Sequence, residues 1–300
     1  QFYVIINGKF GGNIMRVDYI DNKALVTGFG CFNLSSSCSC GQSFRWKQRD
    51  GGWFGIAGHR AAFVSLNCKT LSIEPCFEGD ADWWTKYFDL ERDYSAIEKE
   101  ILNDEILSVC LPYASGIHVF NQEPFEALIS FIISSNNNIG RISGIIDRLC
   151  RLAGQQFSIN GELYFAFPEP CSIAKLSVEQ LHSIGAGYRA PFIKKSALMV
   201  ADGYDLGGLR NMSLDEARKE LYKFPGVGPK VADCVLLFSL GHTDAFPIDV
   251  WMDRAMKELY FNSLPPSKAQ LREMIARLGK YSGIIQQYIF HYARHVKLGK

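Results

Sequence analysis

The sequence predicts an α+β protein in which a small antiparallel β-sheet domain precedes a larger, mostly helical domain. From about residue 24 to residue 73, short aromatic and apolar runs alternate with glycine, aspartate and asparagine, which is typical of antiparallel strands joined by tight turns. After Glu78 the apolar residues recur at helical spacing. We expect a β-rich domain over residues 13–112 and a helical domain over residues 113–300, with residues 1–12 a tail or foreign to the natural chain.

The strand-like runs of the first domain are TGFGCFNL (27–34), QSFRWKQ (42–48), GGWFGIAG (51–58), AAFVSLN (61–67) and LSIEP (71–75). In the second part, apolar residues at helical spacing predict a helix over 93–107. Pro124 opens another helix, because proline is well placed in a first turn. Ser213 and Glu216 form a capping box before a further helix, and an apolar stripe predicts a last one over 283–296.

Length and composition exclude several protein classes. The chain has 300 residues, 47% hydrophobic and 21% charged, which suffices for two or three packed units of a soluble protein. Apolar runs fall short of the ~20 residues of a membrane span, and the N-terminus lacks a signal-peptide pattern. The nine cysteines lack zinc spacing and mostly stand among apolar residues, as reduced thiols do. We expect a cytoplasmic or nucleoplasmic protein with no membrane partner and no structural metal cluster.

The net charge of +1 does not by itself indicate a nucleic-acid-binding protein, but the charges are unevenly distributed. Residues 74–105 carry eleven acidic and three basic side chains, whereas residues 251–300 carry nine basic and three acidic ones. The C-terminal part could therefore face a polyanion. Two ordinary solvated helical faces would explain the same charges equally well.

The segment from Leu221 to Arg254 carries the most information. A helix ends near Phe224, the chain turns through Pro-Gly-Val-Gly, and Pro229 begins a second helix. Gly226 and Gly228 allow positive φ and a close approach to another surface. Backbone N–H groups at such a turn suit a DNA phosphate, so this hairpin is a candidate DNA-binding site, although glycine turns between helices are common.

Lys230 stands in the first turn of the apolar helix that follows, with Cys234 one turn later and Asp249 nineteen residues beyond. A helix N-terminus disfavours a cation, and burial does the same, so the position favours a neutral, nucleophilic amine. Such an amine can attack the anomeric carbon of a nucleoside and form a Schiff base. Asp249 could stabilise positive charge on the sugar. On these residues alone, a solvated lysine and a helix-capping aspartate remain the favoured interpretation.

The segment as a whole resembles the helix-hairpin-helix and aspartate signature of base-excision DNA glycosylases of the HhH-GPD superfamily. Within it, the chain resembles the 8-oxoguanine DNA glycosylase/AP lyase branch, through SCGQSFRW (39–46), ISFIISSNNNIGRI (129–142), IGAGYRAPFI (184–193) and YSGIIQQYIF (281–290). This resemblance implies a helical glycosylase domain with its helix-hairpin-helix at about 215–240. Endonuclease III relatives carry iron–sulfur cysteines after the hairpin, whereas no cysteine follows Cys234. We therefore expect no iron–sulfur cluster.

The resemblance also implies roles in base recognition. Lys230 and Asp249 become the catalytic pair. Gly41 offers its carbonyl to the N7 hydrogen that 8-oxoguanine has and guanine lacks, which can discriminate strongly at a buried site. Gln286 reads the Watson–Crick edge and Phe290 stacks on the base, while Cys234 covers the opposite face. Without the resemblance, Gly41 would be interpreted as a strand turn and Phe290 as a core residue.

Further positions match residues that contact the duplex. Asn136 fills the gap left by the extruded nucleotide, Arg141 and Arg189 read the orphaned cytosine, and Tyr188 wedges beside it. Arginine donors suit the O2 and N3 acceptors of cytosine. Unaided, these residues would be interpreted as a polar loop and surface arginines. Two positions depart from the family pattern, since Trp251 replaces a histidine associated with a phosphate and Ala293 replaces an aspartate.

The implied function is a bifunctional DNA glycosylase/AP lyase that excises 8-oxoguanine opposite cytosine during base excision repair. Its partner would be double-stranded DNA, and we expect a monomer that needs no cofactor, either nucleoid-associated or nuclear. The resemblance also implies a monovalent or divalent cation at the hairpin, held by the backbone carbonyls of Tyr222, Phe224 and Val227. Two alternatives stay open: a glycosylase for another damaged base, and a non-catalytic helix-hairpin-helix DNA-binding module.

Overall fold

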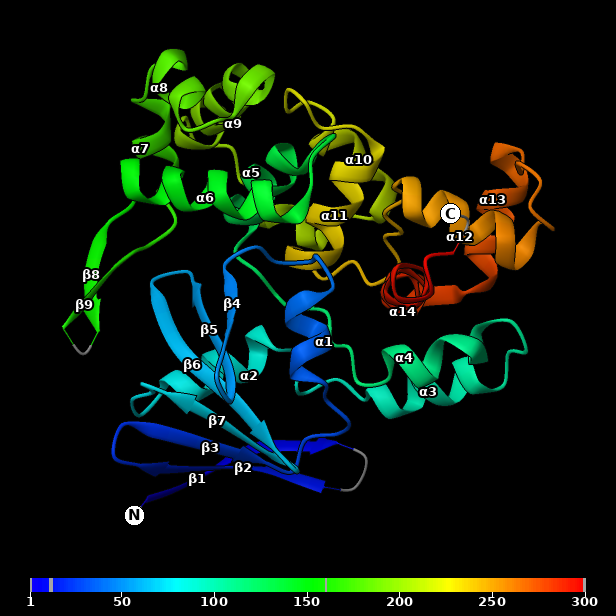
Figure 1. Cartoon of the computed structure of the whole chain (residues 1–300), viewed down its shortest axis with the longest axis horizontal. Helices are drawn as coiled ribbons and strands as arrows, with labels where there is room; N and C mark the ends of the chain where they lie inside the picture. The colour runs from blue at the N-terminus through cyan, green and yellow to red at the C-terminus, as the bar shows by residue number, and fades with distance from the viewer. Residues whose placement is uncertain (1, 11–12, 160, 299–300) are drawn as a thin grey trace.

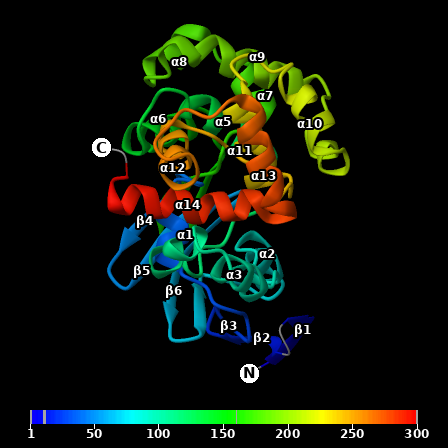
Figure 2. The same ribbon diagram turned by 90° about the vertical axis from the view of Figure 1, so that its right-hand side faces the viewer.

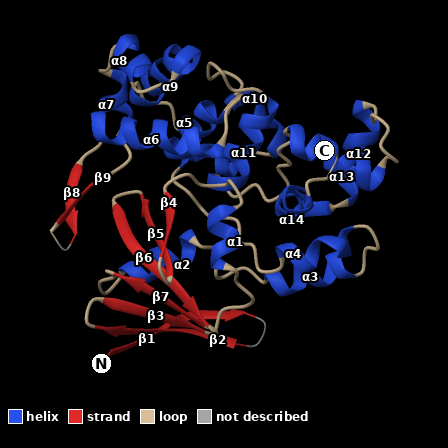
Figure 3. Ribbon diagram, in the orientation of Figure 1, coloured by secondary structure: helices blue, strands red, loops and turns tan. Residues whose placement is uncertain are grey.

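The computed structural model describes residues 2–10, 13–159 and 161–298. It confirms the predicted α+β class, because an antiparallel sheet is followed by a mostly helical part (Figure 1). Figure 3 shows strands β1 to β7 gathered at one end of the molecule, with α1 and α2 beside them, and most of the helices at the other end. No helix among the described residues has both the length and the apolar character to cross a membrane.

The described residues form one seven-stranded sheet with the order β1-β2-β3-β7-β6-β5-β4, and every pairing in it is antiparallel. The strands are β1 (Phe2–Phe10), β2 (Asn13–Ile20), β3 (Lys23–Thr27), β4 (Trp46–Arg49), β5 (Gly52–Ala57), β6 (Arg60–Asn67) and β7 (Thr70–Glu74). Residues 2–10, expected as a tail, thus form an edge strand, whereas residues 1, 11 and 12 lie outside the described residues.

The run 27–34, predicted as a strand, leads instead into helix α1 (Leu34–Ser39). The side chain of Asn33 accepts the N–H of Ser36 at 2.9 Å, and the Ser37 hydroxyl donates to the Asn33 carbonyl at 2.7 Å. These local bonds favour a helix over a strand, which the aromatic pattern alone does not predict. The other helices before residue 115 are α2 (Asp80–Tyr87), α3 (Tyr94–Leu102) and α4 (Leu111–Ala114).

The helical part begins with α5, in which Pro124 occupies the first turn as predicted. Its elements are α5 (Pro124–Ser134), α6 (Ile139–Ala153), α7 (Pro170–Ala174), α8 (Val178–Ser183), α9 (Ala190–Ala201), α10 (Leu214–Leu221), α11 (Pro229–Ser239), α12 (Val250–Tyr260), α13 (Lys268–Arg277) and α14 (Ser282–Val296). The predicted capping box of Ser213 and Glu216 starts α10. Figure 2 shows α14 crossing the molecule between α12 and α1.

Two hydrophobic cores stabilise these parts. The sheet packs its apolar face on an aromatic cluster that includes Trp46, Trp84, Phe88 and Phe120. The helical core collects most of the remaining buried side chains and also takes in residues from α3, such as Ile97 and Ile101. The helical core therefore extends N-terminal to the division expected at residue 112.

A two-stranded hairpin of β8 (Gln156–Ile159) and β9 (Glu162–Phe165) projects from the helical part toward the sheet (Figure 1). The Tyr164 ring packs on Phe54 of β5 with centroids 4.9 Å apart, and the Arg45 guanidinium donates to the Phe165 carbonyl. The apolar spacing of the sequence predicts only helices in this region. The hairpin forms because cross-domain packing supports strands that are individually marginal.

Helices α10 and α11, joined by a short turn, are tied together by an ion pair. Arg218 Nε donates to Asp233 Oδ1 at 2.6 Å, and the two side chains are 26% and 10% exposed. Burial raises the pKa of Asp233, and Arg218 opposes this shift by hydrogen bonding and by its charge. The pair fixes the angle between the two helices of the hairpin and hence the position of the first turn of α11.

We expect Arg218→Met to lower the free energy of unfolding by about 2–3 kcal/mol, because it leaves the Asp233 charge buried without its partner. Urea unfolding monitored by circular dichroism measures the change. Arg277→Met is the matched control, since its pair with Glu273 is 74% and 66% exposed and should be worth less than about 1 kcal/mol. Equal losses in the two variants would contradict this account of the hairpin.

Candidate active site

One cavity of about 840 Å³ lies where the end of α5, the start of α11, the loop before α12 and α14 meet the segment after α1. Its size is typical of a small-molecule or nucleoside site. The residues singled out in the sequence that line it are Gly41, Asn136, Gly226, Gly228, Lys230, Cys234, Asp249, Trp251, Gln286 and Phe290. Those that do not line it are Arg141, Tyr188, Arg189, Tyr222, Phe224 and Val227.

Lys230 is half-buried in the first turn of α11. Its Nζ donates to the Ser134 hydroxyl at 3.0 Å and lies 5.1 Å from the centre of the Phe131 ring. Both partners belong to α5, and Ser134 is 96 residues away from Lys230 in sequence. Since neither partner is charged, the amine stands among neutral groups at the wall of the cavity.

Cys234 lies one turn further along α11 and is buried. Burial raises the pKa of the Cys234 thiol to about 11, while the nearby Lys230 acts in the opposite direction. The thiol is therefore neutral at physiological pH. It offers the cavity a polarisable, weakly polar wall rather than a second nucleophile.

Asp249 is the N-cap of α12, because its Oδ1 accepts the N–H of Met252 at 2.9 Å. The sequence alone favours a helix-capping aspartate here, and Asp249 does cap α12. Asp249 also lines the cavity, so one carboxylate caps a helix and supplies negative charge to the site.

Gly41 adopts φ +86°, in the left-handed region that favours glycine. A Cβ there would stand 3.3 Å from Ile139 Cδ1 and 3.9 Å from Phe290 Cε1, so the space beside this residue belongs to the cavity. The next residue, Gln42, anchors the segment. Its Nε2 donates to the carbonyls of Ser37 and His118, and its Oε1 accepts the N–H of Phe120.

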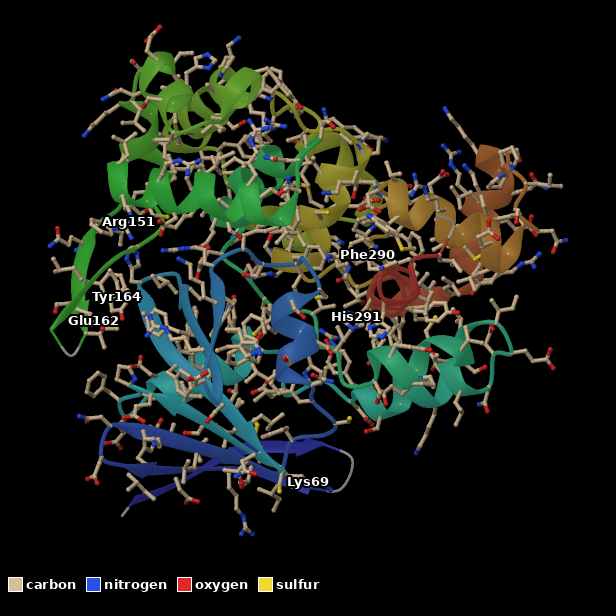
Figure 4. The ribbon with its side chains drawn as sticks, in the orientation of Figure 1. Lys69, Arg151, Glu162, Tyr164, Phe290 and His291 are labelled. Carbon is tan, nitrogen blue, oxygen red and sulfur yellow. The ribbon has the colours of Figure 1, made fainter. Side chains whose placement is uncertain are left out.

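Gln286 and Gln287 form a hydrogen-bonded chain on α14. Gln286 Nε2 donates to the Pro247 carbonyl at 3.1 Å, and Gln287 Nε2 donates to Gln286 Oε1 at 2.6 Å. Because a carbonyl can only accept, it fixes which end of each amide faces its neighbour. Gln287 Oε1 remains buried without a partner among the described residues. Figure 4 labels Phe290 on the same helix, where α14 faces α11.

The turn between α10 and α11 presents free backbone donors. Gly226 has φ +81°, and a Cβ there would lie 2.6 Å from Phe192 Cδ2, so only glycine fits. Among the described residues, the N–H groups of Gly226, Gly228 and Lys230 donate to no acceptor. Unpaired donors at a helix N-terminus are a ready anion site.

Arg189 lies inside the molecule, only 3% exposed, although the sequence suggests a surface residue. Its Nε donates to the Ser135 carbonyl at 2.9 Å and its Nη2 to the Asn136 carbonyl at 3.1 Å. Asn136 itself is exposed with φ +48°. Tyr188 covers Arg189 with its ring at 4.3 Å and is 55% exposed, and Arg141 is exposed at the start of α6.

Three side chains important to this geometry were not singled out in the sequence, namely Ser134, Gln42 and Gln287. Each lies in one of the sequence stretches on which the family resemblance rests. Neighbouring residues do not predict the hydrogen-bond partner of these side chains, because the partner lies far away along the chain or depends on a side-chain rotamer. The described residues contain no group of three or more histidine, cysteine, aspartate or glutamate side chains that could hold a metal ion.

Two family descriptions match consecutive parts of the chain. Residues 26–128 match the N-terminal domain of 8-oxoguanine DNA glycosylases. Residues 129–280 match the HhH-GPD superfamily of base excision DNA repair proteins. Most of the sequence-predicted residues that line the cavity fall within this second range. Gly41 falls within the first range, and Gln286 and Phe290 lie beyond the second, on α14.

Related proteins and a solved structure are similar to this chain over most of its length. A probable N-glycosylase/DNA lyase of Methanothermobacter thermautotrophicus is 34% identical and covers 69% of this chain and 71% of its own length. The N-glycosylase/DNA lyase OGG1 of Arabidopsis thaliana is 36% identical over 83% of this chain and 74% of its own. The 8-oxoguanine glycosylase/lyase of Clostridium acetobutylicum, solved with duplex DNA containing cytosine opposite 8-oxoguanine, superposes with a TM-score of 0.90 at 34% identity, covering 94% of this chain and 98% of that one.

The two tasks of Asp249 can be separated. Asp249→Ala should lower the free energy of unfolding by about 1 kcal/mol, because the α12 cap is lost. Asp249→Asn should cost less than about half of that, since asparagine caps a helix nearly as well. Guanidinium unfolding measures both. If asparagine is as destabilising as alanine, the carboxylate charge rather than the cap stabilises the fold.

Proposed function

Because the chain belongs to the HhH-GPD superfamily of base excision DNA repair proteins and carries the N-terminal domain of 8-oxoguanine DNA glycosylases, we propose that it excises 8-oxoguanine from duplex DNA and then cleaves the strand at the abasic site. The observation that carries the proposal is the Lys230 amine, held by neutral partners at the wall of a nucleoside-sized cavity that Asp249 also lines. A non-catalytic DNA-binding module needs neither feature.

Base removal begins when the damaged nucleotide leaves the helix and enters the cavity, at a cost of a few kcal/mol in stacking and pairing. The lone pair of Lys230 Nζ attacks C1′, and the C1′–N9 bond breaks with its electron pair going to the base. The proton that the amine loses neutralises the departing base. The C1′–O4′ bond then opens, O4′ takes a proton, and an imine joins Lys230 to the sugar.

Asp249 acts on the charge that develops during this displacement. The sugar is cationic as the C1′–N9 bond breaks, and a fixed carboxylate stabilises that charge more strongly in a partly closed site than in water. The Met252 N–H holds Oδ1, so the carboxylate does not have to reorganise during the reaction. Its position as a helix cap is therefore part of its catalytic role.

Strand cleavage follows from the imine. The imine makes the C2′ hydrogen acidic, so a base can remove it and the electrons form a C2′–C3′ double bond. The 3′ phosphate leaves with the C3′–O bond pair, and water then hydrolyses the imine to release Lys230. This β-elimination needs no organic cofactor.

Recognition of the lesion uses the walls of the cavity. The Gly41 carbonyl accepts the N7 hydrogen of 8-oxoguanine, and the fixed amide of Gln286 reads the Watson–Crick edge. Phe290 and Cys234 cover the two faces of the purine. Guanine, which has a lone pair at N7, would face the Gly41 carbonyl with repulsion.

Recognition of the duplex uses the adjoining surface. The free N–H groups of the hairpin bind phosphates of the DNA backbone. Asn136 fills the gap left by the flipped nucleotide, and Tyr188 wedges beside the opposite base. Arg141 and Arg189 read cytosine there, and Arg189 must first leave the Ser135 and Asn136 carbonyls. A single chain supplies all these groups, so the protein acts as a monomer. It acts on chromosomal DNA, in a nucleoid or in a nucleus.

The carbonyls of Tyr222, Phe224 and Val227, proposed as cation ligands, suit a monovalent cation. Among the described residues, the carbonyls of Tyr222 and Val227 accept no backbone hydrogen bond, while that of Phe224 accepts the N–H of Val227 at 3.1 Å. Neutral oxygens without a carboxylate suit a monovalent better than a divalent cation. Such an ion would hold the turn in shape and add positive charge beside the DNA phosphate.

We expect Lys230→Gln to bind an 8-oxoguanine:cytosine duplex with nearly unchanged affinity but to lose roughly 10³-fold or more of the excision rate, because the nucleophile is gone. Sodium borohydride should trap wild type on this duplex, but neither the variant nor wild type on an undamaged duplex. Lys69→Gln, in the turn between β6 and β7 and away from the cavity (Figure 4), is the control and should behave as wild type. Normal excision by Lys230→Gln would exclude the mechanism.

Gly41→Ala should lower the rate of 8-oxoguanine excision by about 10-fold or more, because the new methyl group displaces the carbonyl that reads N7–H. Gly51→Ala is the matched control, since Gly51 has φ +80° with nothing within 4 Å and lies outside the cavity. Both variants should lose about 1 kcal/mol of stability from backbone strain. If the single-turnover rates of the two variants are equal, Gly41 does not read the lesion.

A further inference from the structure

The hydroxyl of Ser134 stands between the nucleophilic amine and the backbone of α5. Lys230 Nζ donates to Ser134 Oγ at 3.0 Å, and Ser134 Oγ donates to the Phe131 carbonyl at 2.8 Å. Ser134 is only 9% exposed and lines the cavity. The two bonds form a short directed chain from the amine to a main-chain carbonyl.

The direction of this chain follows from the chemistry of its members. A carbonyl can only accept, so the single hydrogen of the Ser134 hydroxyl is committed to Phe131. Toward Lys230 the hydroxyl therefore offers a lone pair and takes one N–H of the amine. A serine oriented the other way would donate its hydrogen to the amine and mask the lone pair that must attack C1′. The Phe131 carbonyl thus keeps the nucleophile exposed.

We propose that Ser134 is the positioning residue of Lys230, and that it couples the nucleophile to the base opposite the lesion. This inference rests on the proposed function. Ser134 touches neither the sugar nor the base. It acts by holding one N–H of the amine, which restricts the rotation of Nζ and directs its lone pair toward the cavity.

The coupling runs through the next residues of the chain. Ser134 is the last residue of α5, and the carbonyls of Ser135 and Asn136 are held by the buried guanidinium of Arg189. The Tyr188 hydroxyl also donates to Ser135, at 3.3 Å. When Arg189 turns to an orphaned cytosine, it releases these carbonyls, and the end of α5 that carries Ser134 can adjust. The nucleophile and the opposite-base reader therefore share one three-residue segment.

Ser239 shows what a serine hydroxyl with a purely structural role looks like in this fold. Serine hydroxyls near helix ends often donate to a carbonyl three or four residues back, and Ser239 at the end of α11 does this toward Val235 at 2.6 Å. Ser239 is 1% exposed and does not line the cavity. It is the matched control, because Ser239→Ala removes a similar buried hydroxyl without touching Lys230.

The first experiment measures single-turnover borohydride trapping on a duplex with a preformed abasic site, together with affinity for a tetrahydrofuran abasic analogue. Ser134→Ala should slow trapping by roughly 10- to 100-fold with less than about a 2-fold change in Kd, as expected for a misplaced nucleophile. Ser134→Thr, which keeps the hydroxyl, should recover most of the rate, and Ser239→Ala should match wild type. A Ser134→Ala trapping rate within about 2-fold of wild type, or equal losses in the two alanine variants, would overturn the positioning role.

The second experiment measures excision of 8-oxoguanine opposite cytosine and opposite adenine by wild type and Ser134→Ala. The preference for cytosine is the ratio of the excision rate opposite cytosine to the rate opposite adenine. If the opposite base acts through Ser134, this ratio should fall toward 1 in Ser134→Ala. An unchanged preference would show that the two sites act independently and would overturn the coupling. Wild-type excision alone tests the proposed function, whereas the ratios between variant and wild type test this inference, so the two can fail separately.

Discussion

Helix α11 packs against α5 through the stacked rings of Phe131 and Phe238, whose centroids lie 5.3 Å apart. This buried contact holds the last turn of α11 against α5, and the contacts of Lys230 with Ser134 and Phe131 hold its first turn against the same helix. Lys230 then lies beside Ser134, and the free N–H groups of the hairpin face outward. The Arg218–Asp233 pair holds the other side of α11. Packing between two helices thereby places the Lys230 amine and a turn with unpaired N–H groups together.

The walls of the cavity are ordered by neutral hydrogen bonds that end on backbone groups. Gln42 satisfies its amide on three main-chain groups and fixes the loop of Gly41, while the Pro247 carbonyl orients Gln286 and, through it, Gln287. Such chains hold polar atoms in place without buried charge, which suits a site that must distinguish two purines differing at N7 and C8. Arg189, outside the cavity, also ends on backbone groups, because its buried guanidinium donates to the carbonyls of Ser135 and Asn136.

Much of the fold could be predicted from the sequence, because patterning and capping are local. Strands β4 to β7, the helix opened by Pro124 and the capping box at Ser213 depend on neighbouring residues, and the structure has them, whereas β1 and β2 are not among the predicted strands. Helix α1 and the β8–β9 hairpin could not be predicted, since the first depends on the Asn33 cap and the second on packing against Phe54. The resemblance pointed to Lys230 and Asp249, which share a cavity, but not to Ser134, whose contact depends on tertiary packing.

In the proposed reaction, Lys230 becomes covalently joined to the sugar of an 8-oxoguanine nucleotide. Peptide mapping of the borohydride-reduced complex by mass spectrometry tests it most directly, because it locates the sugar remnant on one residue. We expect a single modified peptide from the first turn of α11, with the added mass on Lys230. A remnant on another lysine or on the N-terminal amine, or free base released with no modified peptide, would contradict it.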